Sequence, residues 1–399
     1  MKMDDSMIHG SVEPGFEKVK TAFVENFKQG QEVGAACAIY HKGKKVVDLW
    51  GGYRDIKSKD PWKEDTLVLV FSTTKGMSAM AMALAHSKGY FDYDEKVSTH
   101  WPDFAQNGKE NVSVRQLLSH QAGLCAIDEP MDLEVLGNTE KLAKILAAQA
   151  PLWEPGKKHG YHALTLGWYE SELIRKTDPQ HRTMGQFFKD EIAKPLGLEF
   201  YIGLPTEVPD SRIANMHAPM YTLRMIFNSK KMPKAFISAF MKKGTTTKRA
   251  FSNPKVLGKI PMYNTRAMRR IELPAANGIG QVRDIAKLYG IFSMGASEIG
   301  IKPETMDAIT KPAKEPQDGR FDEVLQSESR FSLGFLKPFP ECQFGTSEKA
   351  FGTPGAGGSF GFADPETQTG FAYAMNKSGF YLLVDERQKA LSDAYFGCI

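Results

Sequence analysis

Two kinds of hydrophobic pattern alternate along the chain, and they occupy different parts of the sequence. Residues 14–30 carry apolar side chains at the spacing of an amphipathic helix that ends at Gly30. Residues 33–53 form two strand-like runs joined by a turn at Lys42 and Gly43. Helical spacing then dominates the middle of the chain, at 112–123, 139–149, 165–176 and 184–197. The C-terminal part returns to strand patterns at 330–339, 359–365 and 370–377, followed by a helical pattern at 385–396.

This order of patterns predicts an α+β fold with strands at both ends of the chain. Both sets of strands are buried most simply in one mostly antiparallel sheet that is covered by the terminal helices. We expect residues 1–95 and 275–399 to form this sheet domain, and residues 96–274 to form an inserted, mostly helical domain. Ligands usually bind in the cleft between such domains.

The composition is that of a soluble globular protein. Of 399 residues, 42% are hydrophobic and 25% are charged. No run reaches the roughly 18 apolar residues that a membrane-spanning helix needs. The first 15 residues lack the apolar stretch of a secretory signal, so we expect a cytoplasmic location. The four cysteines lie far apart without a C-x-x-C pair, which favours neither a disulfide framework nor a structural zinc site.

The net charge of +4 is unevenly distributed. Residues 211–271 hold fourteen Lys and Arg and no acidic residue, and they also hold seven of the 18 methionines. No helix-turn-helix, zinc-finger or RNP pattern accompanies them, so a nucleic-acid partner is not expected. Flexible methionines adapt to varied apolar ligands, and we interpret this segment as a cover over a pocket. A membrane-contacting surface, which is possible but not favoured, and an oligomer contact are the alternatives, and the oligomeric state stays open.

The candidate chemistry begins where the apolar run "LVLVF" meets the Met- and Ala-rich run after it. Ser72 and Lys75 stand there, one helical turn apart on the same face. A lysine removes the proton of a serine hydroxyl only if burial keeps the amine neutral, and the apolar flanks favour that. The N–H groups at the start of the helix could stabilise an oxyanion. A plain N-cap serine beside a solvated lysine is the alternative.

Two other serines compete for the role of nucleophile. Ser252 and Lys255 have the same spacing, but the proline between them spoils the helical face. Ser359 lies in Gly-Gly-Ser-Phe-Gly, which fits the nucleophile elbow of α/β-hydrolases. A strand–turn–strand pattern follows it where that fold has a helix, and all nine histidines lie at or before position 217. Its glycines more simply permit close backbone approach beside the site.

Two further segments join "FSTTKG" in an order that resembles serine β-lactamase-like proteins. They are "WEPGKKHGYHALTLGWYESELI" at 153–174 and "FGTPGAGGSFGFADP" at 351–365. Within that superfamily the chain is most similar to family VIII carboxylesterases and to β-lactamase domain-containing proteins, through "VVDLWGGYRD", "HWPDFAQNGKE" and "GAGGSFGFADP". The resemblance covers roughly residues 10–399 and is weakest across the basic segment. It implies the β-lactamase/transpeptidase-like fold.

The resemblance also implies the roles of individual residues. Ser72 matches the acylated nucleophile, Lys75 its proton acceptor, and Tyr161 the tyrosine that relays protons to the leaving group. Without the resemblance, a buried tyrosine bonded to the backbone is the simpler interpretation of Tyr161. The segment Thr353-Pro354-Gly355 occupies the place of the Lys/His-Thr-Gly strand. The next residue, Ala356, would offer the second oxyanion N–H beside that of Ser72.

Gly357 and His162 complete the candidate substrate-binding set, and His162 could tune the lysine–tyrosine pair. His159 and His162 have the spacing of a metal-ligand pair, but no third ligand motif is visible. His120 is interpreted as a structural histidine. We therefore expect neither a metal ion nor an organic cofactor.

Two departures from the superfamily pattern bear on the substrate. Ala163 stands where asparagine is frequent, and Thr353 where β-lactamases have lysine. Losing a charged partner for a carboxylate costs on the order of 1.5–3 kcal/mol of recognition. The sequence thus predicts a carboxylesterase that acts on neutral short- to medium-chain esters. A β-lactamase or D-alanyl peptidase, an acyltransferase on the same site, and a non-catalytic scaffold are the alternatives.

Overall fold

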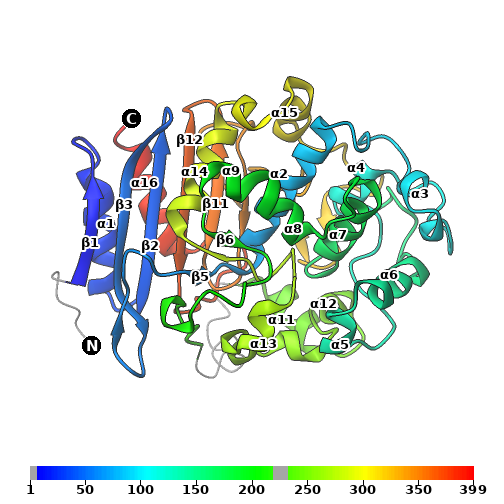
Figure 1. Cartoon of the computed structure of the whole chain (residues 1–399), viewed down its shortest axis with the longest axis horizontal. Helices are drawn as coiled ribbons and strands as arrows, with labels where there is room; N and C mark the ends of the chain where they lie inside the picture. The colour runs from blue at the N-terminus through cyan, green and yellow to red at the C-terminus, as the bar shows by residue number, and fades with distance from the viewer. Residues whose placement is uncertain (1–6, 219–231) are drawn as a thin grey trace.

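The computed structural model describes residues 7–218 and 232–399. Its central antiparallel sheet has the strand order β1-β3-β2-β12-β11-β10, and the strands stand side by side in Figure 1. Their bounds are Ile8–Val12 (β1), Gly34–His41 (β2), Lys44–Asp55 (β3), Phe351–Pro354 (β10), Phe360–Asp364 (β11) and Thr369–Met375 (β12). A short strand β4 (Asp60–Pro61) pairs with β3.

The two ends of the chain meet in the middle of this sheet. Strand β12 pairs with β2 from Thr369 opposite His41 to Met375 opposite Ala35. Every residue of β12 is buried, because helices cover both faces of the sheet. The prediction of one antiparallel sheet built from both ends of the chain is therefore confirmed.

The covering helices come from distant parts of the chain. Helices α1 (Glu17–Lys28) and α16 (Glu386–Phe396) pack together on one side of the sheet, and α14 (Val282–Ser293) packs on the other (Figure 1). Helix α14 approaches β12 closely: a Cβ on Gly370 would lie 2.0 Å from the backbone nitrogen of Gly290. Glycine at 370 is what permits this contact.

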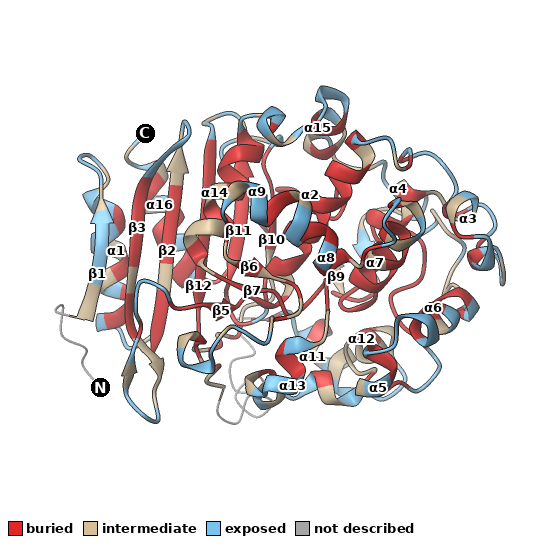
Figure 2. Cartoon of the chain, in the orientation of Figure 1, coloured by how far each residue is buried: buried red, intermediate tan, exposed pale blue. Residues whose placement is uncertain are grey.

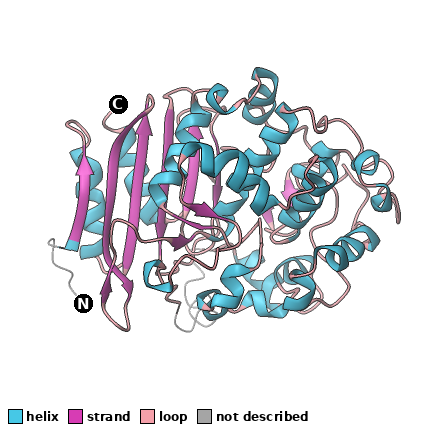
Figure 3. Ribbon diagram, viewed as in Figure 1, coloured by secondary structure: helices cyan, strands magenta, loops and turns pink. Residues whose placement is uncertain are grey.

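The other side of the molecule is mostly helical, as Figure 3 shows. At its centre α2 (Thr74–Ser87) is buried along all of its length except His86, and it contacts α7 (Thr165–Thr177) and α8 (Met184–Phe188) (Figure 2). Helix α8 continues through a π-helical turn, Lys189–Ala193, into α9 (Lys194–Leu196). The other α-helices of the described residues are α3 (Val97–His100), α4 (Val114–Leu118), α5 (Leu133–Leu136), α6 (Thr139–Ala148), α11 (Lys234–Met241), α12 (Thr246–Phe251), α13 (Arg266–Arg270) and α15 (Pro303–Thr310).

The remaining strands are short and form two small separate sheets. Strands β5 (Val68–Leu69), β7 (Ile279–Gly280) and β6 (Phe200–Tyr201) form a small antiparallel sheet, and β8 (Phe321–Asp322) pairs with β9 (Ser327–Glu328). None of the helices in residues 7–218 and 232–399 has the length and apolar character to cross a membrane.

Two sequence-based expectations need correction. Residues 330–339 do not form a strand: Phe331 and Leu336 make only isolated bridges, and the chain turns at Gly334, where φ is +82°. The apolar residues of this segment are buried in an irregular loop. The helix expected at 112–123 spans only Val114–Leu118, because His120 and Gly123 adopt positive φ angles of +64° and +69°. The edge strand β1 was not predicted, because Ile8 and Val12 are its only apolar residues and they do not form an alternating pattern.

Candidate active site

Ser72 lies on a strained turn between strand β5 and helix α2. A single turn of 3-10 helix, Phe71–Thr73, precedes α2, and Phe71 has a φ of +45°, which is rare for a residue with a side chain. The turn is held on both sides of Val70: its N–H donates to the carbonyl of Gly278 (3.0 Å), and its carbonyl accepts from the Ser359 hydroxyl (2.7 Å). This support keeps Ser72 at the start of the helix, facing a cavity.

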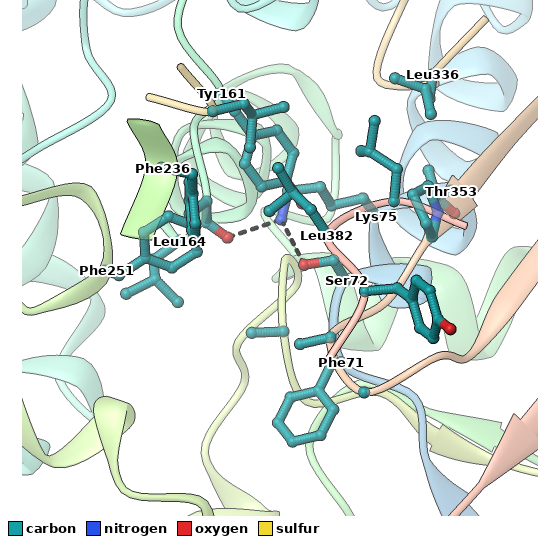
Figure 4. A pocket seen from close by; sticks show the side chains of 18 of the residues that line it. Phe71, Ser72, Lys75, Tyr161, Leu164, Phe236, Phe251, Leu336, Thr353 and Leu382 are labelled. Atoms are coloured by element: carbon teal, nitrogen blue, oxygen red, sulfur yellow. Dashed lines mark hydrogen bonds between the residues drawn. The ribbon is translucent and has the colours of Figure 1, made fainter. Parts of the chain in front are cut away.

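The amine of Lys75 lies beside the Ser72 hydroxyl, with Nζ 3.4 Å from Oγ (Figure 4). The amine also donates to the carbonyl of Ala163 (2.7 Å) and to that of Ala275 (3.0 Å). A neutral amine has two N–H groups and one lone pair, so two carbonyls and one hydroxyl match the needs of the base form. Distances of this kind tighten in the substrate complex.

Burial makes Lys75 a base near neutral pH. The side chain is 1% exposed, and this desolvation lowers the pKa of Lys75 to about 7, against a weaker raising effect of Glu170. A buried lysine beside a serine is therefore not a solvated surface residue, and the plain N-cap alternative does not describe this site.

Glu170 of helix α7 is a buried acid that faces the same helix. A Cβ placed on Gly334 would lie 3.5 Å from Oε1 of Glu170 and 2.7 Å from the Cβ of Ala79, which is one turn after Lys75. Neither carboxyl oxygen makes a hydrogen bond within the part of the chain that the structure describes. Burial raises the pKa of Glu170, and the cation of Lys75 opposes this rise. An acid inside the otherwise apolar run 166–170 was the one sequence signal for this residue, and it was missed.

Tyr161 packs between the lysine and an aromatic ring. The Nζ of Lys75 lies 4.7 Å from the centre of the Tyr161 ring, and the Phe331 ring stacks at 6.2 Å with an angle of 12°. The backbone N–H of Tyr161 donates to both carboxylate oxygens of Asp322 (3.0 and 3.1 Å). Burial raises the pKa of Tyr161, and a hydrogen bond with Ser72 opposes the rise. The phenol thus contacts the candidate nucleophile.

The histidines form a neutral layer behind Tyr161. The backbone N–H of His162 donates to Nδ1 of His120 (3.1 Å), and Nδ1 of His162 donates to the carbonyl of Gly160 (2.7 Å). Burial lowers the pKa of His162 to about 4 and that of His120 well below its usual value. His120 lines the cavity and His162 does not. In residues 7–218 and 232–399 no three His, Cys, Asp or Glu side chains come together in a way that could hold a metal ion.

The end of strand β10 and the residues after it form another wall of the cavity. The Thr353 hydroxyl lies 3.2 Å from the carbonyl of Thr73, to which it donates, and 2.9 Å from the Tyr289 hydroxyl. Residues 355–358 then make a turn in which the N–H of Gly358 donates to the carbonyl of Gly355 (3.1 Å). Gly357 has a φ of +88°, as the third position of a type II turn requires.

The backbone N–H of Ala356 makes no hydrogen bond within the described ranges, and Ala356, Gly357 and Thr353 all line the cavity. Gly355 does not line it: its N–H donates to the carbonyl of Ser359 (2.7 Å) and closes the base of the turn. Ser359 is therefore a support for two loops, because its hydroxyl and its carbonyl are both engaged.

The cavity above Ser72 is mainly apolar, and part of the basic segment covers it. Its wall includes Phe236 from α11 and Phe251 from α12 (Figure 4). Phe240 from α11 also lines it. Further apolar wall residues are Phe71, Leu164, Met232, Leu257, Ile260, Tyr263, Leu325, Phe331, Leu336, Leu382 and Leu383. Among the described residues that line the cavity, Lys75 is the only Lys, Arg, Asp or Glu. Residues 219–231, which belong to the cover predicted from the sequence, lie outside the described residues.

We expect the acylation of Ser72 to depend on pH through Lys75. Because its pKa is lowered to about 7, the neutral amine predominates above that pH, and kcat/KM should rise with pH through this value. Burial also raises the pKa of Glu170 to about 8, so its carboxyl is largely neutral where Lys75 titrates, and Glu170→Gln should leave the rising limb in place. Glu172→Gln is the matched control, since Glu172 is also buried on α7 but pairs with Arg175 and Lys176. A limb that moves to lower pH in Glu170→Gln would show that Glu170 is ionised beside Lys75 and would contradict this expectation.

The profile of the family described as Beta-lactamase matches residues 19–394. The chain is 30% identical over 381 residues to Esterase/beta-lactamase LipL of Mycobacterium tuberculosis, covering 93% of this chain and 83% of that protein.

Solved structures agree over nearly the whole chain. A family VIII carboxylesterase superposes with a TM-score of 0.85 at 36% identity, covering 98% of this chain and all of that one. A penicillin-binding protein homologue from Caulobacter crescentus superposes with a TM-score of 0.84 at 35% identity, with the same coverage. The chain thus belongs to the beta-lactamase family and has the fold of its serine hydrolases.

Proposed function

We propose that the protein is a carboxylesterase that hydrolyses neutral short- to medium-chain esters through an acyl-enzyme on Ser72. One observation carries this proposal: the Ser72 hydroxyl and a desolvated Lys75 amine lie 3.4 Å apart in an apolar cavity whose described wall holds no other Lys or Arg. The similar family VIII carboxylesterase structure and the esterase-named relative support it.

The chemistry follows from these positions. Ser72 Oγ attacks the ester carbonyl while its proton passes to Lys75 Nζ, with Tyr161 beside both. The N–H groups of Ser72 and Ala356 stabilise the oxyanion. When the intermediate collapses, the bond to the alcohol oxygen breaks, and the proton moves from Lys75 through Tyr161 to that oxygen. A water molecule then attacks the acyl-enzyme in the same way and releases the acid.

The wall of the cavity favours substrates without a carboxylate. At the place of the lysine found in β-lactamases, the Thr353 hydroxyl is held by Thr73 and Tyr289. Ala163 lacks the amide side chain frequent in the superfamily, and its carbonyl binds Lys75 instead. A β-lactam would therefore bring a buried carboxylate with no cationic partner, which is costly.

Intact-protein mass spectrometry tests the proposal directly. We expect brief exposure to p-nitrophenyl butyrate to add a butyryl group on Ser72, and turnover of this ester to exceed that of nitrocefin. Faster nitrocefin turnover and a stable penicillin adduct would support the β-lactamase or D-alanyl peptidase alternative. Faster transfer to an added alcohol than to water would support an acyltransferase. A fluorophosphonate probe that fails to label the intact protein would leave only a scaffold role.

The cover should control acyl-chain length. Phe236 is 4% exposed and lines the cavity, so Phe236→Ala should enlarge the cavity and shift the preferred p-nitrophenyl ester to a longer chain. Ile237→Ala is the control, because Ile237 packs against the small apolar cluster that contains Phe236 but is not part of the cavity wall. The two variants should differ in chain-length profile. Identical profiles would mean that α11 does not shape the acyl site.

A further inference from the structure

A buried ion cluster lies directly behind the turn that carries Ala356. Its centre is the Arg387 guanidinium near the start of α16, and its acids are Asp385 and Glu32. The side chain of Arg387 is 5% exposed, and the side chains of both acids are 1% exposed. We refer to Arg387, Asp385 and Glu32 as the clamp.

The clamp is held by a complete set of hydrogen bonds. Nε and Nη2 of Arg387 donate to the two carboxylate oxygens of Asp385, each at 2.9 Å. Nη1 donates to Glu32 (3.1 Å) and to the carbonyl of Lys377 (2.9 Å). Such bidentate pairing fixes the plane of a guanidinium.

One arm of the clamp reaches the turn. Nη2 of Arg387 donates to the carbonyl of Gly357 at 2.6 Å, and the same carbonyl accepts the N–H of Gly379 at 2.8 Å. Gly379 lies in the loop whose residues Ser378, Tyr381, Leu382 and Leu383 line the cavity. The clamp therefore joins the turn to a second wall of the site.

Two glycines show how closely the backbone sits on the clamp. A Cβ on Gly358 would lie 2.7 Å from both Nη2 of Arg387 and Oδ2 of Asp385. A Cβ on Gly379 would lie 2.3 Å from Oδ2 of Asp385. Side chains at these positions would push the guanidinium away from the turn.

We propose that Arg387 is a positioning residue that fixes the 355–358 turn, so that the N–H of Ala356 points at the oxyanion. This inference rests on the proposed function, because it gives Ala356 the role of oxyanion donor. Buried charges are costly to desolvate and are not in themselves a source of stability. A fixed donor, by contrast, stabilises the transition state without reorganising during the reaction.

The test compares kcat with KM in two clamp variants and one control. Arg387→Lys keeps the positive charge but loses the planar guanidinium that binds Asp385 and Gly357 together. It should lower kcat about 10²-fold while KM changes less than about threefold. Gly379→Ala displaces the clamp from outside the turn and should act in the same direction, which keeps the test decisive if Arg387→Lys does not fold. Tyr395→Phe is the control: Tyr395 lies on the same helix as Arg387, and the variant removes the hydrogen bonds of its hydroxyl with Thr369 of β12 and His41 of β2 but should keep the wild-type kcat.

Thermal unfolding midpoints are measured for all three variants. A folded Arg387→Lys protein with kcat within twofold of wild type overturns the inference. The inference is also overturned if Tyr395→Phe, which leaves the clamp intact, loses kcat in the same proportion to its loss of stability as the clamp variants do. Butyrylation of wild-type Ser72 distinguishes failure of the proposed function from failure of the positioning role. If Ser72 is not butyrylated, the proposed function is overturned as well. If Ser72 is butyrylated and the clamp variants are unimpaired, only the positioning role of Arg387 is overturned.

Discussion

Ser72→Ala should abolish turnover of p-nitrophenyl butyrate, with kcat reduced by at least about 10⁴-fold. The variant retains the cavity and Lys75, so the loss would come from the missing nucleophile and not from binding. The Oγ atom of Ser72 is in reach of Lys75 and Tyr161, and the removal of this one atom leaves nothing for them to activate. Steady-state kinetics and fluorophosphonate labelling measure the result.

Ser359→Ala is the matched comparison, because Ser359 is the other serine with a nucleophile-like motif. Its hydroxyl donates to the Val70 carbonyl and accepts from Thr73, 3.1 Å away. The variant should lose about 1–2 kcal/mol of stability but still be labelled at Ser72. Labelling that persists in Ser72→Ala and vanishes in Ser359→Ala would reverse the assignment of the nucleophile.

Lys75→Met should reduce kcat/KM by about 10³-fold or more, because it removes the general base while conserving the length of the side chain. Lys75→Arg should be equally impaired, since a guanidinium stays protonated and cannot accept the serine proton. Both variants should remain folded, because methionine suits an apolar site and arginine can still donate to Ala163 and Ala275.

A second buried lysine provides a stringent control for this prediction. Burial lowers the pKa of Lys337 to about 7 as well, but its amine donates to the carbonyls of Thr310 and Lys349, and it does not line the cavity. Lys337→Met should therefore lower stability and leave kcat/KM within a few-fold of wild type. Equal losses of kcat/KM in Lys75→Met and Lys337→Met would show that the loss comes from replacing a buried lysine in general, and they would contradict the role of Lys75 as the base for Ser72.

Much of the architecture follows from local patterns. The strand pairs at 33–53 and 359–377 and the helices at 14–30, 139–149, 165–176 and 385–396 are regular, strongly periodic segments, and each appears in the structure. The segment at 330–339 did not follow its pattern, because alternating apolar residues also suit an irregular loop packed between the sheet and the cavity. The division into domains at 95 and 275 stays a prediction.

The sequence by itself determined which residues could react: the spacing of Ser72 and Lys75 on one helical face, and the order of motifs that includes Tyr161 and Thr353. Only the tertiary structure decided that the Lys75 amine is buried and donates to the carbonyls of Ala163 and Ala275, which are 88 and 200 positions away along the chain. It also brought Glu170 toward α2 and Arg387 under the 355–358 turn. The physical reason is that spacing fixes only neighbours along a helix, whereas desolvation and hydrogen-bond partners come from whichever distant segments pack against it.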